Sequence, residues 1–192
     1  ALDTAELFYP DFDQAYAENL AKQFELPLYK KINSLSTGYG SIFRIVLGLS
    51  VNTPYVLFDE PVLGLDAQHR DLFYKLLVQK YAESPCTMVI STHLIAEVAD
   101  LIEHTVIIRK GRILQNAPTE ALTAACWAVS GPAGLVDGWA AGRDVFTSSV
   151  LGGLKTVCVR GGGTEDLPAG LERRRMGLQD YFISLMEEED QR

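Results

Sequence analysis

The chain has 192 residues and a formal net charge of −8, from 17 lysines and arginines against 25 aspartates and glutamates. Because it has no basic field to attract phosphates, this balance argues against a general nucleic-acid binder. No apolar run approaches the roughly 18 residues that a membrane-spanning helix needs. The three cysteines, Cys86, Cys126 and Cys158, are odd in number and widely spaced, so we expect no disulfide framework and no metal-binding pattern.

Amphipathic and capping patterns predict two helices in the first quarter of the chain. We expect one over residues 11–24, begun by Asp11 or Asp13, with apolar side chains at four-residue spacing on one face. A polar connector then leads to a second helix, which Ser36 caps and which runs to about Leu49.

The central segment alternates strands and helices. The short apolar runs 55–58 and 87–90 predict fully buried parallel strands. Asp66 is expected to cap the helix between them. After a further short helix, Lys110–Gly111 predicts the turn of a β-hairpin.

The pattern changes near Pro118, and we interpret residues 116–192 as a small α+β domain. The run Arg173–Arg175 favours a solvated charged loop, with a membrane or regulatory contact as the alternative. The expected elements are a helix at 119–126, a strand at 127–129, a helix at 132–141, strands at 145–150 and 155–160, a turn at 161–163 and a helix at 178–188.

The strongest chemical signal is the pair of carboxylates, Asp59 and Glu60, directly after the first apolar strand. Open α/β sheets place their ligands at the carboxyl ends of strands. In a nucleotide hydrolase, one such carboxylate holds Mg²⁺ and the other orients the attacking water. The alternative is an ordinary strand end with acidic turn residues, and for the pair alone the two interpretations are evenly balanced.

Two weaker signals lie on either side of this strand. Leu35–Tyr39 combines a hydroxyl, a glycine and free N–H groups at a helix start, which can form an anion site. For this segment alone, an ordinary Ser36 cap is the favoured interpretation. His93 follows the second apolar strand, where it can reach a phosphate or a catalytic water, although a lone histidine is more often structural.

In order and spacing, these segments resemble the ATP-binding-cassette (ABC) family of ATPases over about residues 1–115. Leu35–Tyr39 looks like the family's signature loop and Tyr55–Glu60 like its Walker B strand. Gly64–Asp66 looks like its D-loop, and His93 like its switch histidine. The resemblance implies an α/β fold, a partial P-loop NTPase core of the ABC type with a helical subdomain.

The resemblance and the change near Pro118 together predict three domains. Residues 1–52 are the helical (signature) subdomain, and residues 53–115 are the C-terminal half of the ATPase core. Residues 116–192 form the small α+β C-terminal domain.

The sequence departs from the family pattern in two places. Thr37 and Tyr39 occupy the third and fifth positions of a signature that usually reads Leu-Ser-Gly-Gly-Gln, a variation similar to that of cassettes of antibiotic-resistance and bacitracin-type exporters. No Gly-x-x-x-x-Gly-Lys-Ser/Thr phosphate loop occurs anywhere, and the family's glutamine loop is also absent. We therefore expect an N-terminally truncated chain, inactive alone, with a naturally reduced protein as the alternative.

In the family, two cassettes bind two ATP molecules between them, head to tail. The resemblance therefore implies that the signature residues Leu35, Ser36, Thr37 and Gly38 contact the γ-phosphate of ATP held by a second ABC subunit. It also implies that Asp66 crosses the interface between the two subunits.

The same resemblance assigns the chemistry. Asp59 would bind Mg²⁺ through water, Glu60 would polarise the hydrolytic water, and His93 would bridge that water to the γ-phosphate. The implied cofactors are ATP and Mg²⁺.

The implied function is the ATP-hydrolysing subunit of a transporter, at the cytoplasmic face of a membrane. A transmembrane permease would dock on residues 1–52, and no nucleic-acid partner is expected. The alternatives are an ABC ATPase of translation or repair and a catalytically inactive ABC-like regulator.

Overall fold

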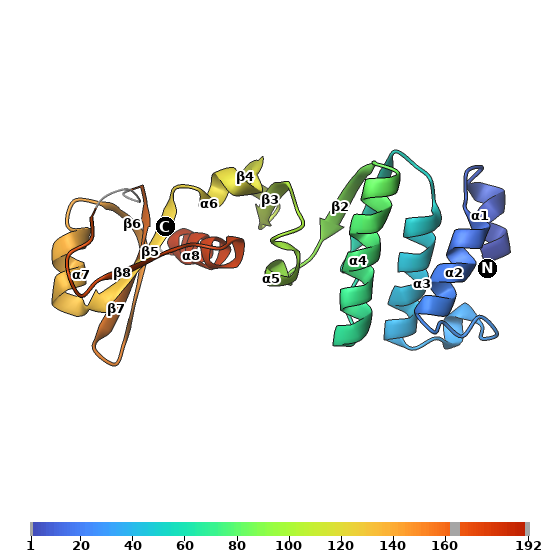
Figure 1. Ribbon diagram of the computed structural model, residues 1–192, viewed down its shortest axis with the longest axis horizontal. Helices are drawn as coiled ribbons and strands as arrows, with labels where there is room; N and C mark the ends of the chain where they lie inside the picture. The colour runs from blue at the N-terminus through green and yellow to red at the C-terminus, as the bar shows by residue number, and fades with distance from the viewer. Residues whose placement is uncertain (1, 162–165, 191–192) are drawn as a thin grey trace. The chain divides into compact units, whose positions relative to one another are not determined.

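The computed structural model describes residues 2–161 and 166–190 of the chain. They divide into two units, Ala1–His93 and Leu94–Arg192, each of which we describe by itself (Figure 1). The finer division at residues 52 and 115 stays a prediction. Of the turn expected at 161–163, only Gly161 is described, and the rest lies outside the described residues.

Side-chain caps begin the longer helices of the first unit, as the sequence predicts. Asp13 Oδ1 accepts from Tyr16 N at 2.8 Å, and Ser36 Oγ accepts from Tyr39 N at 3.3 Å. A short first helix was not expected. The helices are α1 (Leu2–Phe8), α2 (Gln14–Gln23), the 3₁₀ turn η1 (Ile32–Ser34), α3 (Thr37–Ser50) and α4 (Ala67–Glu83).

The helices pack around aromatic side chains that are completely or almost completely buried. Phe73 on α4 meets Phe58 edge-on, with ring centroids 5.5 Å apart. Gly48 on α3 lets that helix approach the strand closely, because a Cβ there would lie 2.6 Å from Phe58 Cε1. The close contact between Gly48 and Phe58 sets the position of the strand Tyr55–Asp59 along α3, and so positions the carboxyl end of that strand.

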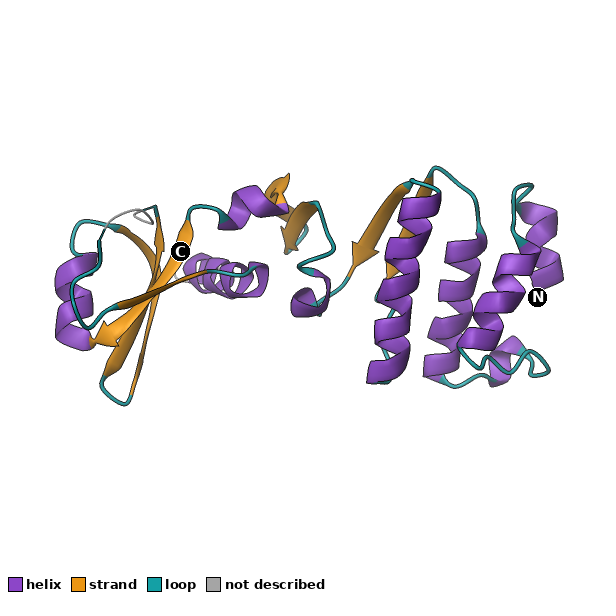
Figure 2. Ribbon diagram, viewed as in Figure 1, coloured by secondary structure: helices purple, strands orange, loops and turns teal. Residues whose placement is uncertain are grey.

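The two strands of this unit are parallel, as expected. β1 (Tyr55–Asp59) pairs with β2 (Thr87–Ser91), in a register that runs from Tyr55 opposite Thr87 to Asp59 opposite Ser91. Figure 2 shows both strands beside the helices of the unit.

The expectation that both strands are fully buried is wrong. Val56 and Phe58 are buried, but Tyr55 and Leu57 are 74% and 69% exposed, and on β2 Val89 is 49% exposed. A continuous apolar run shows that both faces of a strand suit burial, but not that both are covered. Within the described residues, the helices cover only one face of this pair.

The second unit contains a hairpin and a four-stranded antiparallel sheet. Both residues of the hairpin turn have positive φ, 49° at Lys110 and 75° at Gly111, which is the geometry that favours tight hairpins. The sheet has the order β6-β7-β5-β8. The elements are α5 (Ile95–Val98), β3 (His104–Arg109), β4 (Arg112–Pro118), α6 (Thr119–Thr123), β5 (Cys126–Pro132), α7 (Ala133–Ala140), β6 (Asp144–Leu151), β7 (Leu154–Arg160), β8 (Glu172–Arg175) and α8 (Leu178–Asp190).

A helix covers each face of the four-stranded sheet. Val129 and Val157 pack with Trp139 of α7 on one face. Cys126 packs with Tyr181 and Leu185 of α8 on the other. The mixed helix and strand content confirms the expected fold class.

The structure corrects the interpretation of Arg173–Arg175, which form strand β8 at the edge of the sheet rather than a solvated loop. The strand pairs antiparallel with β5, so its conformation depends on a distant segment that local composition does not reveal. Cys86, Cys126 and Cys158 are free thiols. None of the described helices combines the length and the apolar character needed to cross a membrane.

Candidate functional site

The paired carboxylates lie at the carboxyl end of β1. Glu60 N donates to Ser91 O at 2.8 Å, which extends the parallel ladder by one bond beyond Asp59. Glu60 then adopts a left-handed conformation with φ of 42°, uncommon for a residue with a Cβ. The chain turns sharply at Glu60, where Leu63 N donates to Glu60 O at 3.1 Å.

Two residues that follow β2 hold the Glu60 carboxylate. Oε1 accepts from His93 N at 3.2 Å and lies 2.8 Å from His93 Nδ1. Oε2 accepts from Thr92 Oγ1 at 3.2 Å. Because an ionised carboxylate only accepts, a hydrogen bond at this contact requires a proton on His93 Nδ1, which leaves Nε2 for another partner.

The site is accessible. The side chain of Glu60 is 31% exposed and that of His93 is 65% exposed. Both expected residues are therefore brought together where water and a ligand can reach them. Thr92 was missed in the sequence, where a threonine beside a histidine carries no distinctive signal.

Asp59 is the neighbouring carboxylate and is exposed. In the described part of the chain its side chain has no hydrogen-bond or ion-pair partner, and no group of three His, Cys, Asp or Glu residues could hold a metal. Mg²⁺ is usually bound by one or two carboxylates together with waters and substrate phosphates. Asp59 fits the role of the single carboxylate, with substrate phosphates as the other negatively charged ligands of the ion.

The segment Leu35–Tyr39 forms the start of α3. Ser36 caps the helix, and its O–H remains free to donate because the oxygen serves as the acceptor of the cap. Gly38 lies against a second loop: a Cβ at Gly38 would be only 2.6 Å from Gly64 O. Gly64 itself has φ of 80°. The two expected loops thus touch through backbone at a pair of glycines.

A serine one turn into α3 strengthens this contact. Ser41 Oγ donates to Leu63 O at 3.0 Å, and Arg44 Nη2 donates to Ser41 Oγ at 3.1 Å. Ser41 is buried, with only 1% of its surface exposed. It joins the helix that begins at Ser36 to the turn that begins at Glu60, a link that the sequence did not predict.

Asp66 begins α4 and accepts from His69 N at 2.9 Å, while its two carboxylate oxygens lie 3.0 Å from His69 Nδ1. The backbone N–H of His69, followed by its imidazole, lowers the pKa of Asp66. His69 also stacks on Phe24, with ring centroids 6.0 Å apart. Within this chain, Asp66 is a helix cap, and its role at an interface stays a prediction.

No protein-family model matches the chain. Among curated proteins, it is 33% identical to the ABC transporter ATP-binding protein YtrB of Bacillus subtilis over 97 residues, which are 50% of this chain and 33% of that protein. It is 28% identical to the putative ABC transporter ATP-binding protein AlbC of the same organism over 114 residues, 58% of this chain and 47% of that protein. The chain thus spans a third to a half of the length of these relatives.

Solved structures agree on the fold. The ATP-binding subunit of an ABC transporter matches 63% of this chain and 52% of its own, with a TM-score of 0.55 and 24% identity. A putative cobalt transport ATP-binding protein matches 79% of this chain and 54% of its own, with a TM-score of 0.51 and 18% identity. About half of the chain is therefore homologous to the ATP-binding proteins of ABC transporters, and its fold is part of the ABC-type P-loop ATPase fold.

Proposed function

We propose that this chain is part of an ATP-hydrolysing subunit of an ABC transporter, and that Glu60 orients the attacking water. The observation that carries the proposal is the Glu60 carboxylate, held by Thr92 and His93 beside the unpaired carboxylate of Asp59. A general base must be fixed within hydrogen-bond reach of the proton that it accepts. Three donor atoms, on two residues after the neighbouring strand, fix this carboxylate, and its remaining acceptor capacity is left for a water.

His93 and Asp59 complete the proposed site. With Nδ1 directed at Glu60, His93 Nε2 is the atom that would face the water or the γ-phosphate, and it donates to phosphate when both ring nitrogens are protonated. Asp59 would hold Mg²⁺ through water. When bound, the ion neutralises charge on the reacting phosphates.

The phosphate-binding residues of this chain would serve ATP on another subunit. Ser36 retains a hydroxyl proton, and the α3 N-terminus directs backbone N–H groups outward, so both can bind an anion. We infer that Leu35, Ser36, Thr37 and Gly38 contact the γ-phosphate across a head-to-tail interface that Asp66 also reaches. These 192 residues contain no phosphate loop, so turnover requires one from another segment or chain.

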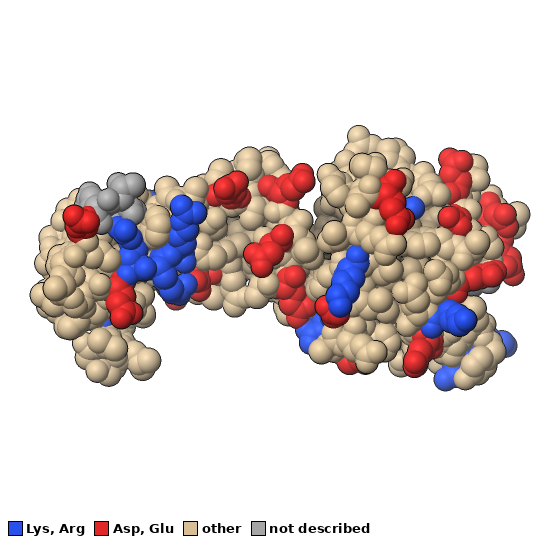
Figure 3. All heavy atoms as spheres, in the orientation of Figure 1, with Lys and Arg blue, Asp and Glu red and all other residues tan. Residues whose placement is uncertain are grey.

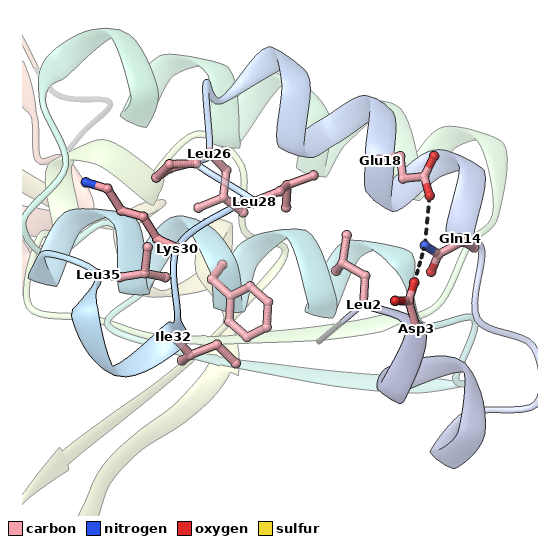
Figure 4. Close-up of a pocket in the computed structure, with 11 residues that line it drawn as sticks. Leu2, Asp3, Gln14, Glu18, Leu26, Leu28, Lys30, Ile32 and Leu35 are labelled. Atoms are coloured by element: carbon pink, nitrogen blue, oxygen red, sulfur yellow. Dashed lines mark hydrogen bonds between the residues drawn. The ribbon is translucent and has the colours of Figure 1, made fainter.

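The proposed contact with a transmembrane permease lies in residues 1–52, where a groove of about 290 Å³ opens between α1, α2 and the segment before α3 (Figure 4). Leu2, Leu28, Ile32 and Leu35 give it apolar walls. Gln14 Nε2 donates to Asp3 Oδ1 at 3.4 Å and to Glu18 Oε1 at 2.9 Å. Asp3 and Glu18 put negative charge at one end of these apolar walls, so the groove suits an apolar segment with a basic residue at that end. Docking of such a permease segment would hold the chain at the cytoplasmic side of a membrane.

Glu60→Gln tests the catalytic role. The variant is made in a polypeptide that joins a phosphate-loop segment ahead of this chain. We expect ATP binding to persist and hydrolysis to fall by at least about 10²-fold, because the amide keeps the shape but cannot take up a proton.

Asp71→Asn is the matched control, since Asp71 is an exposed carboxylate on α4 paired with Lys75. It should leave hydrolysis unchanged. Normal turnover by Glu60→Gln would remove Glu60 from the catalytic role. If the joined polypeptide without any substitution binds ATP but does not hydrolyse it, the inactive-regulator alternative would be favoured instead.

A further inference from the structure

A buried hydroxyl on α3 is hydrogen-bonded to the turn that follows Glu60. Ser41 is only 1% exposed, and its Oγ donates to Leu63 O at 3.0 Å. Leu63 N donates in turn to Glu60 O at 3.1 Å. The two backbone groups of Leu63 are therefore bonded to different elements, one to the turn residue Glu60 and the other to the helix. Because buried polar groups are normally hydrogen-bonded, the hydroxyl at position 41 and the path of this turn depend on each other.

The side chain of Arg44 fixes the direction of this hydroxyl. Arg44 Nη2 donates to Ser41 Oγ at 3.1 Å. A guanidinium only donates and a hydroxyl has one proton, so the proton of Ser41 is directed at Leu63 O. Figure 3 shows acidic side chains spread over the displayed face of this unit, yet Arg44 forms no ion pair with any described carboxylate. Its guanidinium is directed at the hydroxyl instead.

The turn at Glu60 has a conformation that needs support from its surroundings. Glu60 has φ of 42°, and a left-handed residue with a Cβ persists only where the structure around it holds it. The bond from Glu60 N to Ser91 O, at 2.8 Å, holds the turn on the side of the strand. The bond from Ser41 to Leu63 holds it on the side of the helix. The direction in which the Glu60 side chain leaves the turn therefore depends on both bonds.

We propose that Ser41 is a positioning residue for Glu60, which acts through Leu63 O to keep the carboxylate within hydrogen-bonding distance of His93. Glu60 Oε1 lies 2.8 Å from His93 Nδ1 and 3.2 Å from His93 N. The hydrogen bonds of Ser41 go to Leu63 and Arg44 and not to the carboxylate, so its effect is carried by the turn. Arg44 supports this role by orienting the hydroxyl.

The catalytic meaning of this link rests on the proposed function, and the link adds a consequence to it. Ser41 lies about one turn after Ser36 and Gly38 on the same helix. The start of α3 would contact the phosphate of ATP held by another subunit, while Ser41 holds the turn at Glu60. A movement of α3 when that phosphate binds would therefore move the carboxylate that orients water in this chain's own site.

The competing explanation is that the bond from Ser41 to Leu63 only stabilises the fold. Loss of the hydroxyl would then lower the free energy of unfolding, but the folded molecules would keep the same contact between Glu60 and His93. The two explanations differ in the state of the His93 ring, because the nitrogen that carries the proton is set by the hydrogen bond that the ring makes.

The first test uses the full chain alone and needs no nucleotide. Long-range ¹H–¹⁵N NMR spectra at about pH 9, where imidazole is neutral, report which ring nitrogen of His93 carries the proton. We expect Nδ1 in the parent chain. Ser41→Ala should shift the population toward Nε2, in the same direction as Glu60→Ala, which removes the acceptor altogether. A parent ring protonated on Nε2, or an unchanged ring in Ser41→Ala, would overturn the proposal.

Two further variants separate positioning from a general loss of stability. Ser50→Ala is the matched control, because Ser50 is fully buried on the same helix and its Oγ has no hydrogen-bond partner among the described residues. It should leave the His93 ring unchanged, and a shift equal to that of Ser41→Ala would refute the role of the hydroxyl. Arg44→Met removes the donors at an exposed position where a change of side chain is tolerated, and should give a smaller shift in the same direction. An unchanged ring in Arg44→Met would refute its part in the link.

The second test measures hydrolysis in the polypeptide that joins a phosphate-loop segment ahead of this chain. Ser41→Ala should lower kcat roughly tenfold and leave KM for ATP unchanged, since a displaced catalytic group costs rate rather than substrate binding. An unchanged kcat would contradict the positioning role. If the joined parent polypeptide does not hydrolyse ATP, the proposed function of Glu60 fails, and the spectra of the chain alone still decide whether Ser41 holds its carboxylate.

Discussion

Glu60 and His93 are 33 residues apart in the sequence, yet Glu60 Oε1 lies 2.8 Å from His93 Nδ1. The in-register pairing of β1 with β2 brings both strand ends to the same edge of the sheet. The left-handed turn at Glu60 occurs where the ladder ends. The contact therefore depends on the register of the two strands.

The chain alone should not bind ATP–Mg²⁺ at micromolar concentrations. In the proposed site, Asp59, Glu60 and His93 would face the reacting phosphate, but the backbone cradle and the lysine that hold the phosphates of ATP in a phosphate loop are not in this sequence. Isothermal titration calorimetry measures this directly. Micromolar affinity would mean that an unrecognised segment binds the nucleotide.

Ser36 substitutions separate a helix cap from a phosphate contact. Ser36→Ala removes the acceptor for Tyr39 N–H and should lower the free energy of unfolding by about 0.5–2 kcal/mol. Ser36→Asp retains a good cap but places negative charge at the helix start, so stability should persist. In a polypeptide joined to a phosphate-loop segment, the aspartate variant should lose ATP-dependent dimerisation and hydrolysis together.

Urea unfolding measures the free energy of unfolding of each Ser36 variant, light scattering measures ATP-dependent dimerisation, and ATPase assays measure hydrolysis. Ser34→Ala is the control, because Ser34 Oγ bonds Lys31 O within the preceding turn and caps no helix. If Ser36→Asp dimerises and turns over normally, Ser36 is a structural cap alone.

Two glycines on α3 should respond in opposite directions to alanine. At Gly48 a Cβ would lie 2.6 Å from the buried Phe58 ring, so Gly48→Ala should cost about 1–3 kcal/mol through overpacking. At Gly40 nothing lies within 4 Å of the added Cβ, so Gly40→Ala should gain about 0.5–1 kcal/mol from helix propensity. Thermal unfolding compares the pair, and a neutral Gly48→Ala would argue against this close packing of α3 on β1.

The Asp66 cap should make stability depend on pH. Folding lowers the pKa of Asp66 from its ordinary value of 3.8, so its contribution is present above that value and is lost as pH falls through the lowered pKa. The difference in stability between the parent chain and Asp66→Asn should therefore be largest near neutral pH and shrink below about pH 4. Urea unfolding at several pH values measures it.

His69→Ala should keep most of this pH dependence, because the largest cause of the lowered pKa is the backbone N–H of residue 69. A difference between the parent and Asp66→Asn that stays constant from pH 7 to pH 3 would show that the carboxylate contributes only as a neutral cap does.

Local signals predicted the parts of the fold that depend on a few neighbouring residues. The caps at Asp13, Ser36 and Asp66 and the turn at Lys110–Gly111 are all found, because each is decided within about four residues. Strand β8 was missed, because its conformation comes from pairing with β5 across a long stretch of sequence.

The candidate site shows the same division. The sequence indicated Glu60 and His93 through their places after two apolar strands, and the structure joins them. It did not indicate Thr92 or Ser41, whose partners lie 32 and 22 residues away and whose hydroxyls resemble those of any polar surface position. It also could not show which face of β1 is covered, since an apolar run suits burial on either side.

The backbone contact between Gly38 and Gly64 makes these two positions interdependent under mutation. No side chain fits at Gly38 unless the loop around Gly64 retreats, and a substitution at Gly64 is strained by its φ of 80° whatever the space. A library that varies both positions should therefore show strong epistasis, in which most single changes are deleterious and the few tolerated pairs share a displaced loop. Directed evolution of the start of α3 would then have to begin at residue 64.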